Sequence, residues 1–257
     1  MPSIKINPPV IAHRGASVYA PENTLASFLK AKELGVRWLE FDVMLTADAE
    51  VVVIHDDTID RTTNGKGNVV EHSYSFLKKL DAGTWFHPNF SEEKIPLFAD
   101  VIEFLYQHQL AANVEIKALP GKEEITVKKV LEVISQHWRQ EMTPPLISSF
   151  SLSVLRAVRM LSASSQVALL MHEWLPNWQE ICDKLQCMSV NVNEKILTSE
   201  RVKKIQSTDR VVLSYTVNDV KRAAELFSWG VDAVFSDCPD KILKELHLIR
   251  GKQDGKL

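Results

Sequence analysis

Charged side chains interrupt several short apolar runs of this chain, at or near the carboxyl ends of those runs. The interrupting residues are His13, Arg14, Glu40, Asp42, His55, Glu115 and Lys117. Ionisable groups are rarely buried unless they are paired with one another or bind a metal ion. Their recurrence at equivalent places therefore indicates one shared site rather than unrelated surface residues.

Three of these residues are carboxylates that could hold a cation. Glu40 and Asp42 are two residues apart, so on a strand both side chains emerge from one face. Neighbouring carboxylates raise each other's pKa unless a cation lies between them, and Glu115 from a nearby strand would complete the cluster. Oxygen ligands suit a hard divalent cation, with Mg²⁺ or Ca²⁺ favoured and Mn²⁺ or Co²⁺ as further candidates. The alternative is a structural ion pair of Glu40 with Arg37 or Lys117.

Two histidines accompany the carboxylates. His13 and His55 each end a strand-like run, and the unperturbed pKa of histidine lies near neutrality, so the pair could move protons as acid and base. The residues do not say which histidine is the acid. A single histidine at a strand end is more often structural, and zinc ligation is a further alternative, although no close His-x-His spacing supports it.

Two cations complete the set. Arg14 can contact phosphate oxygens through its forked guanidinium, and Lys117 shares a strand face with Glu115. A metal ion with two cations facing an anion is typical of enzymes that act on phosphate esters. The alternative for Lys117 is that it neutralises the carboxylates.

The elements that must position these residues alternate between β and α patterns. We predict strands at 10–13, 37–44, 51–55, 112–117, 145–150, 166–171, 188–192, 210–216 and 231–236. We predict helices at 22–34, 98–108, 123–138, 152–161, 177–185, 199–206 and 218–229, with Asn23 and Thr24 as N-terminal caps of the first helix.

This alternation predicts an α/β fold, a (β/α)₈ TIM barrel, with a doubly wound sheet as the second choice. The strands number one more than a barrel needs, so either 51–55 or the final run is expected to be irregular. The charged residues would then lie at the carboxyl ends of the strands, where a barrel places its active site. We expect one domain over 1–257, with residues 57–96 as an inserted cap segment.

Composition excludes several classes of protein. Lys and Arg number 30 against 33 Asp and Glu, so the chain lacks the excess of basic residues typical of nucleic-acid binding. Its apolar runs are strand-sized, and no apolar leader with a small-residue cleavage site begins it. We expect a cytoplasmic protein without stable membrane anchoring, as a monomer or homodimer, with Cys182, Cys187 and Cys238 as reduced structural thiols.

The ordered motifs resemble the glycerophosphodiester phosphodiesterase family over residues 10–239. The matching segments are His13-Arg14-Gly15, Ala20-Pro21-Glu22-Asn23-Thr24, Glu40-Phe41-Asp42-Val43, His55-Asp56, Arg61-Thr62-Thr63-Asn64-Gly65, Ile95-Pro96, Glu115-Ile116-Lys117, Ser148-Ser149-Phe150, Tyr215-Thr216-Val217-Asn218 and Gly230-Val231-Asp232. The segment 143–150 and the region Glu173-Trp174 to Trp178 are similar to the small cytosolic bacterial members of the family.

The resemblance implies a barrel with an inserted segment, a divalent ion on Glu40, Asp42 and Glu115, and acid–base roles for the two histidines. It further implies phosphate contacts from Arg14 and Lys117. Tyr215 would form the aromatic wall for glycerol where many members carry Trp, and Ser236-Asp237 replaces the more common Thr-Asp.

The expected reaction is hydrolysis of a glycerophosphodiester to sn-glycerol 3-phosphate and an alcohol such as choline, ethanolamine or glycerol. Attack by water and attack by the substrate's own 2-hydroxyl both remain open. One alternative is a lyase resembling bacterial phosphoinositide phospholipases or spider-venom sphingomyelinases, which would release a cyclic phosphate. The other is a non-catalytic barrel that only binds ligands.

Overall fold

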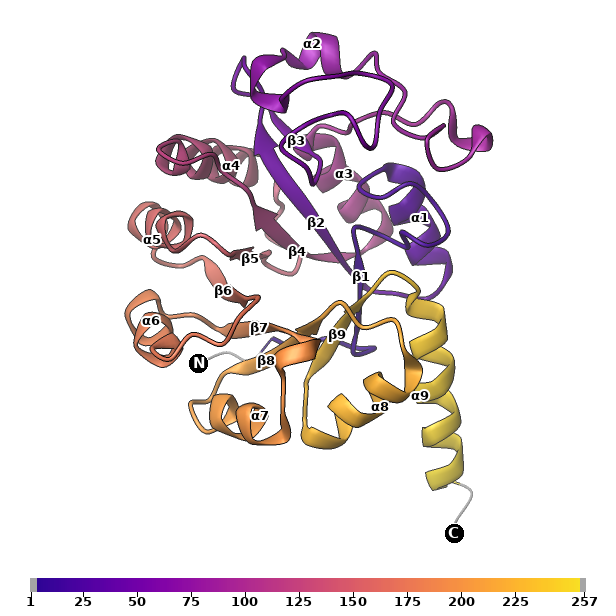
Figure 1. The fold of residues 1–257 in the computed structure, drawn as a ribbon, viewed down its shortest axis with the longest axis vertical. Coiled ribbons are helices and arrows are strands. Elements are labelled where there is room, and N and C mark those ends of the chain that lie inside the picture. Colours follow the sequence, from indigo (N-terminus) through magenta and orange to yellow (C-terminus); the bar gives the residue numbers. More distant parts are fainter. Residues whose placement is uncertain (1–3, 255–257) are drawn as a thin grey trace.

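Short runs rich in valine, isoleucine and leucine form a single sheet in the computed structural model, which describes residues 4–254 (Figure 1). The strands are β1 (Val10–His13), β2 (Trp38–Leu45), β3 (Val51–Val53), β4 (Ala111–Ile116), β5 (Leu146–Ser149), β6 (Gln166–Met171), β7 (Ser189–Asn193), β8 (Val211–Tyr215) and β9 (Ala233–Ser236). Their β-branched side chains favour extended backbone, and both faces of most strands are buried, which explains their continuous apolar sequences.

The sheet closes on itself. The strand order is β1-β9-β8-β7-β6-β5-β4-β2, and β1 also pairs with β2. Within the described residues, eight strands form this parallel ring, while β3 pairs antiparallel with β2 outside it. The predicted (β/α)₈ barrel is confirmed, and the supernumerary strand is the early run at β3 rather than the final one.

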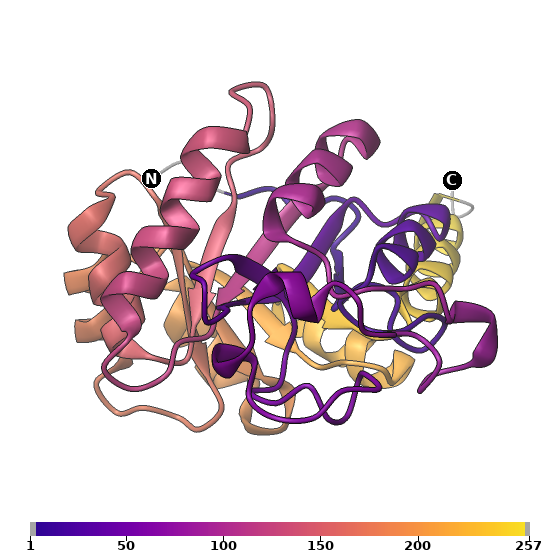
Figure 2. The same cartoon turned by 90° about the horizontal axis from the view of Figure 1, so that it is seen from above.

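Helices surround the ring, as Figure 2 shows from a second direction. They are α1 (Leu25–Glu33), α2 (Tyr74–Leu77), α3 (Phe98–His108), α4 (Glu123–His137), α5 (Leu152–Leu161), α6 (Trp178–Leu185), α7 (Ser199–Gln206), α8 (Val220–Trp229) and α9 (Pro239–Asp254). None of the helices in the described range is both long enough and apolar enough to cross a membrane.

Two helix predictions need correction. The first helix begins at Leu25, three residues later than predicted, because Thr24 is its N-cap and accepts a hydrogen bond from the Ser27 backbone N–H. No helix was predicted after the last strand, yet α9 follows β9 directly. Its first residue is Pro239, and a proline at the first helical position is a common start signal that the sequence did contain.

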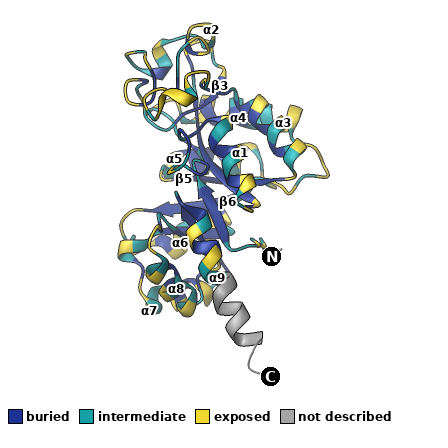
Figure 3. Cartoon of the chain, turned by 90° about the vertical axis from the view of Figure 1, so that its right-hand side faces the viewer, coloured by how far each residue is buried: buried dark blue, intermediate teal, exposed yellow. Residues whose placement is uncertain are grey.

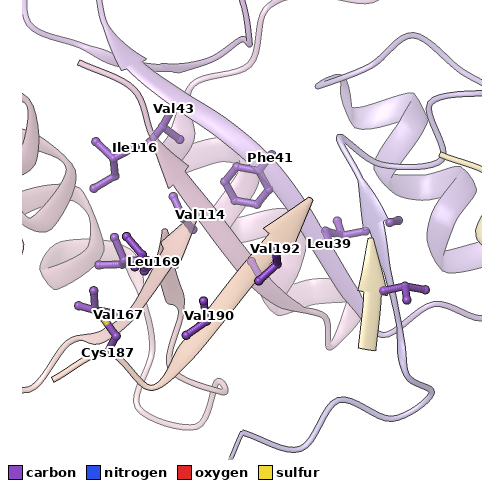
Figure 4. Packing of buried hydrophobic residues seen from close by; sticks show 14 of the residues in the cluster. Leu39, Phe41, Val43, Val114, Ile116, Val167, Leu169, Cys187, Val190 and Val192 are labelled. Carbon is purple, nitrogen blue, oxygen red and sulfur yellow. The ribbon is translucent and has the colours of Figure 1, made fainter. Parts of the chain in front are cut away.

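The main hydrophobic core lies between the ring and the surrounding helices. Outward-facing side chains of β2 alternate with inward-facing ones, so Leu39, Phe41 and Val43 pack against helices (Figure 4). Phe41 lies between the rings of Phe28 and Phe98, at centroid distances of 5.6 and 5.9 Å. Figure 3 shows the strands buried at the centre and exposed residues on the outer helices and loops. Cys182, Cys187 and Cys238 are buried free thiols.

Inside the ring, apolar and polar side chains lie at different levels. Near the strands' amino ends, Ile11, Trp38 and Leu146 belong to a second apolar cluster. Above them, Asn113 donates to the Ser148 hydroxyl at 2.8 Å, within a buried polar layer. The lower half of the barrel is therefore filled, and the carboxyl ends of the strands are left to carry polar groups.

Residues 57–96 leave the barrel between β3 and α3. The segment contains short helical turns, η1 (Val69–Glu71), α2 and η2 (Pro88–Phe90). A small core of its own, including Ile59, Leu77 and Ile95, packs against Met44 of β2 and Val52 of β3. This core attaches the segment to one side of the barrel (Figure 1).

Replacing Phe41 by alanine should lower the free energy of unfolding by about 3–5 kcal/mol, because the buried ring fills the wall between β2 and two helices. Urea denaturation followed by tryptophan fluorescence measures the change. Met160→Ala is the control, since Met160 is 70% exposed and should shift stability by less than about 0.5 kcal/mol. A decrease of less than about 1 kcal/mol in the free energy of unfolding of Phe41→Ala would contradict this role of the Phe41 ring in the core.

Candidate active site

An acidic cluster lies inside the ring, where the middle of β2 pairs with the carboxyl end of β4. Glu40, Asp42 and Glu115 each offer a carboxylate oxygen, and these atoms all lie within 4.8 Å of one another. The parallel pairing of β2 with β4 places Asp42 beside Glu115, and the pairing of β1 with β2 places His13 beside Glu40. The cluster predicted from the spacing of two is thus brought together by strand register.

Burial makes this cluster a strong candidate for cation binding. Glu40 and Asp42 are almost fully buried, and the Glu115 side chain is 12% exposed. Burial, followed by the charge of Asp42, raises the pKa of Glu40 to about 8 and the pKa of Glu115 to about 6. Three buried oxygen donors that repel one another fit a hard divalent cation, because such an ion would relieve the repulsion.

Lys117 and Arg14 already offset part of this charge. The Lys117 ammonium lies 3.0 Å from Glu115 and 3.4 Å from Asp42, and Arg14 Nε lies 3.5 Å from Asp42. Burial raises the pKa of Asp42, but Lys117 and Arg14 outweigh burial, so this pKa is lowered. Asp42 therefore stays ionised more readily than its two neighbours. The neutralising role considered for Lys117 is compatible with its position.

Glu40 contacts a backbone N–H group and lies 4.0 Å from His13 Nε2. Its carboxylate accepts a hydrogen bond from the Arg14 backbone N–H at 2.9 Å. In the part of the chain that the structure describes, Glu40 pairs with neither Arg37 nor Lys117, so the alternative of such a structural ion pair is wrong. Arg14 has a left-handed backbone with φ of 55°, which fits this short turn after β1.

The turn after β1 packs tightly on α1. Gly15 has φ of 84°, and a Cβ atom there would lie 2.3 Å from the Ser27 hydroxyl, so a side chain does not fit. In the same turn Asn23 donates from Nδ2 to Asp42 at 2.9 Å. Asn23 was predicted as a helix cap, but it holds a carboxylate of the cluster instead. Its motif position next to Thr24 could not distinguish the two roles.

Both histidines have the same local arrangement. His13 donates from Nδ1 to Asp237 at 2.7 Å, and His55 donates from Nδ1 to Asp56 at 2.7 Å. The ionised carboxylates can only accept, so each Nδ1 carries the proton and each Nε2 remains available. His13 and His55 both line the same cavity. Each is therefore an imidazole oriented by a carboxylate, an arrangement that is suited to acid–base catalysis.

The environments of the two carboxylate partners differ. Asp237 also accepts from the Ser17 hydroxyl at 2.9 Å and from Asn218 Nδ2 at 2.7 Å, which are neutral donors. Asp56 instead accepts from the cationic guanidinium of Arg61, at 2.6 and 3.0 Å. Asp56 thus has a positive partner, whereas the polar contacts of Asp237 besides His13 are neutral in the described structure.

This difference accompanies opposite shifts in the two histidines. Burial lowers the pKa of His13, but the hydrogen bond to Asp237 and the charge of Glu40 outweigh burial, so this pKa is raised. Burial also lowers the pKa of His55, and the charges of Lys117 and Arg14 lower it further. Asp42 and Asp56 do not compensate fully, so this pKa remains lowered. His13 therefore holds a proton more tightly than His55 does.

Two carboxylates of the site had no predicted role. Asp56 follows His55 directly, so its place beside the imidazole could have been suspected from adjacency. Asp237 directly follows β9, at the same edge of the barrel as His13, but it is 224 residues away in sequence. Its position after the final apolar run was the available signal.

A cavity of about 180 Å³ opens among these groups. Its polar side includes Glu40, Glu115, Arg14 and both histidines. Asp42, the third carboxylate of the cluster, and Lys117, which contacts it, do not line the cavity. Its other side is apolar: Tyr215 at the end of β8 and Phe150 meet edge to face, with centroids 5.8 Å apart. The structure thus places every predicted site residue at or directly behind one cavity.

Comparison with known proteins covers this whole site. The Glycerophosphoryl diester phosphodiesterase family matches residues 13–241. A glycerophosphodiester phosphodiesterase of Caldanaerobacter subterraneus is 34% identical over 238 residues, which span 91% of this chain and 96% of that protein. A glycerophosphodiester phosphodiesterase of Bacillus subtilis is 32% identical over 249 residues, spanning 90% of this chain and 83% of that protein.

A solved structure is similar over almost the same range. The phosphodiesterase of Oleispira antarctica, in complex with the product sn-glycerol-3-phosphate, is 38% identical and has a TM-score of 0.90. The similarity covers 93% of this chain and 96% of that chain. The fold and the sequence therefore point to the same group of proteins.

A divalent cation should bind more tightly as the pH rises from about 6 to 8. The raised pKa values of Glu115 and Glu40 mean that the cation must displace protons from the cluster, so its apparent affinity is lost as the pH falls. Calorimetric titration with Mn²⁺ in buffers of different ionisation enthalpy measures both affinity and proton release.

Glu115→Gln should weaken this binding and reduce the proton release, because the amide removes one ionisable ligand. Glu103→Gln is the matched control, since Glu103 is exposed and pairs with Arg139 away from the cluster. Affinity that is independent of pH, or equal in Glu115→Gln and the unmodified protein, would contradict the cation site.

Proposed function

Because this chain belongs to the glycerophosphoryl diester phosphodiesterase family, we propose that it hydrolyses glycerophosphodiesters to sn-glycerol 3-phosphate and an alcohol. The observation that carries the proposal is the cavity in which two carboxylate-oriented histidines face a buried acidic cluster. A product complex of a protein 38% identical to this chain supports the choice of glycerol 3-phosphate as product.

The cavity suits a small anionic group with a short carbon chain. Arg14 and Lys117 would attract the phosphate, Arg14 from the cavity wall and Lys117 from behind the acidic cluster. The apolar faces of Tyr215 and Phe150 would contact the glycerol carbons. With about 180 Å³ available, the glycerophosphate part fits inside and the alcohol part would extend toward the mouth.

Glu40, Asp42 and Glu115 would hold one divalent cation, with Mg²⁺ or Ca²⁺ as the first candidates, since all three donors are oxygens. When bound, such an ion would stabilise negative charge on a non-bridging phosphate oxygen. Asn23 and the Arg14 backbone N–H would keep two of the carboxylates oriented toward it.

Proton transfer would be divided between the histidines. His55, with the lowered pKa, would accept at Nε2 the proton of the attacking hydroxyl, from water or from the substrate's own 2-hydroxyl. His13, with the raised pKa, would donate its Nε2 proton to the alcohol oxygen as the phosphorus–oxygen bond breaks. Attack by the 2-hydroxyl would give a cyclic phosphate that water opens in a second step.

We further propose that residues 57–96 act as a cap beside the mouth, within a single domain that spans 1–257. The small core that attaches this segment to β2 and β3 supports the proposal, as does its contact with Asp56 through Arg61.

The direct test is turnover of glycerophosphocholine in the presence of Mg²⁺, Mn²⁺ or Ca²⁺. Released sn-glycerol 3-phosphate is measured by a coupled dehydrogenase assay, and EDTA should abolish the release. His13→Ala and His55→Ala should each lower kcat by on the order of a hundredfold or more while the fold is retained.

His137→Ala is the control for these variants, since His137 ends α4 outside the cavity. Phosphorus NMR of the products separates hydrolysis from a lyase, which would accumulate a cyclic phosphate. Turnover by either histidine variant at the rate of the unmodified protein would refute the acid–base roles. Absence of turnover with every diester and metal ion would refute the proposed hydrolase activity.

Asp237→Asn should move the alkaline limb of the kcat/KM profile to lower pH by about one unit. His13 must be protonated to act as the acid, so activity is lost as the pH rises through its pKa, and removing the Asp237 charge lowers that pKa. Asp209→Asn, in the turn before β8, is the control and should leave both limbs in place. A shift of the acid limb alone would reverse the assignment of the two histidines.

A further inference from the structure

Arg61, in the inserted segment, joins two carboxylates that each hold a site residue. Its Nε and Nη2 donate to Asp56 at 2.6 and 3.0 Å, and its Nη1 and Nη2 donate to Glu22 at 2.8 Å each. Bonds of this kind are charge-assisted, and the planar fork of arginine fixes their directions. One guanidinium thus connects the segment after β3 with the loop after β1.

The first arm, which is the pair of hydrogen bonds from Arg61 to Asp56, extends to His55. The same oxygen of Asp56 that accepts from Arg61 Nη2 also accepts from His55 Nδ1, at 2.7 Å. A carboxylate held at both oxygens by a guanidinium cannot rotate freely, so the direction of its bond to the imidazole is set. The orientation of His55 Nε2 in the cavity depends on this bond.

The second arm, which is the pair of hydrogen bonds from Arg61 to Glu22, extends to Arg14. Glu22 accepts from Arg61 and also from Arg14 Nη1, at 2.9 Å. The Glu22 side chain is 13% exposed, so its charge is poorly screened by water and needs these two partners. Arg14 is thereby held between Glu22 and Asp42, with its guanidinium at the cavity.

From these contacts we propose that Arg61 is a positioning residue, which aligns His55 through Asp56 and Arg14 through Glu22 without touching the substrate. The proposal rests on the function proposed above. The inserted segment then contributes to catalysis, because its packing on the barrel places Arg61 between the two carboxylates.

The competing view treats Arg61 as an ordinary surface cation, because exposed ion pairs contribute little to stability. Arg61 is 44% exposed, yet it forms a fork to each of two carboxylates from separate parts of the chain. Arg139 offers a matched comparison at 43% exposure: it pairs with Glu103 at 2.8 Å and lies over the Tyr106 ring. Neither partner of Arg139 contacts the cavity.

Steady-state kinetics on a glycerophosphodiester that the unmodified protein turns over can test this. Arg61→Ala should lower kcat on the order of tenfold to a hundredfold and raise KM several-fold, because both arms are lost. Arg61→Lys should stay impaired, since a lysine keeps the charge but cannot form two forks. Added guanidinium should restore part of the activity of Arg61→Ala, and Arg139→Ala should match the unmodified protein.

The two arms can be separated by a double-mutant comparison. Asp56→Asn should lower mainly kcat, through His55, and Glu22→Gln should raise mainly KM, through Arg14. Arg61→Ala added to Asp56→Asn should then cost little further kcat, because the first arm is already broken.

Three results would overturn the proposal: unchanged kinetics in Arg61→Ala, kcat losses of Arg61→Ala and Asp56→Asn that multiply, or no rescue by guanidinium. Near-ultraviolet circular dichroism reports folding. If Arg61→Ala does not fold, Arg61→Lys provides the test, alone and combined with Asp56→Asn. Full activity of Arg61→Lys would also refute the forked geometry. Because turnover by the unmodified protein is measured first, its absence would count against the proposed function and not against Arg61.

Discussion

The site depends on the repulsion among three carboxylates that the barrel places inside its own ring. Glu40, Asp42 and Glu115 lie within 4.8 Å of one another where little water screens their charges. Burial and mutual repulsion destabilise their ionised forms, which is why the pKa values of Glu40 and Glu115 are raised. The surrounding contacts reduce this destabilisation: Lys117 lies between two of the carboxylates, and the Arg14 backbone N–H binds the third. The remaining charge is what makes the cluster suited to a divalent cation.

The two histidines beside the cluster are likewise held by carboxylates. Each imidazole binds a carboxylate through Nδ1, and the charges around the two rings differ: Glu40 raises the pKa of His13, whereas Lys117 and Arg14 add to burial in lowering the pKa of His55. Asp237 is bound by neutral donors besides His13, whereas Asp56 is bound by the guanidinium of Arg61. Opposite pKa shifts in two similar side chains are the usual way in which one site supplies both an acid and a base near neutral pH. The proposed division of acid and base between His13 and His55 rests on these opposite shifts.

The side chains that pack the core and the side chains of the site lie on opposite faces of the same strand. Along β2, Leu39, Phe41 and Val43 point outward into the core, while the alternating Glu40 and Asp42 point inward. The outer face can therefore be packed tightly without constraining the groups that react. The inserted segment uses another arrangement, since its small core attaches it to the outside of the barrel while Arg61 contacts groups at the mouth.

Local features of the sequence determined the barrel class, most of its elements and the predicted site residues, because strand alternation and helix periodicity act over a few neighbouring residues. The spacing of two between Glu40 and Asp42, and again between Glu115 and Lys117, predicted which side chains share a face. Only the tertiary structure decided that Asp237 orients His13 across 224 residues, that Asn23 binds Asp42 rather than capping a helix, and that Arg61 links Asp56 to Glu22. These contacts require the ring to close and the inserted segment to pack against it, and no local pattern encodes which distant segments then meet.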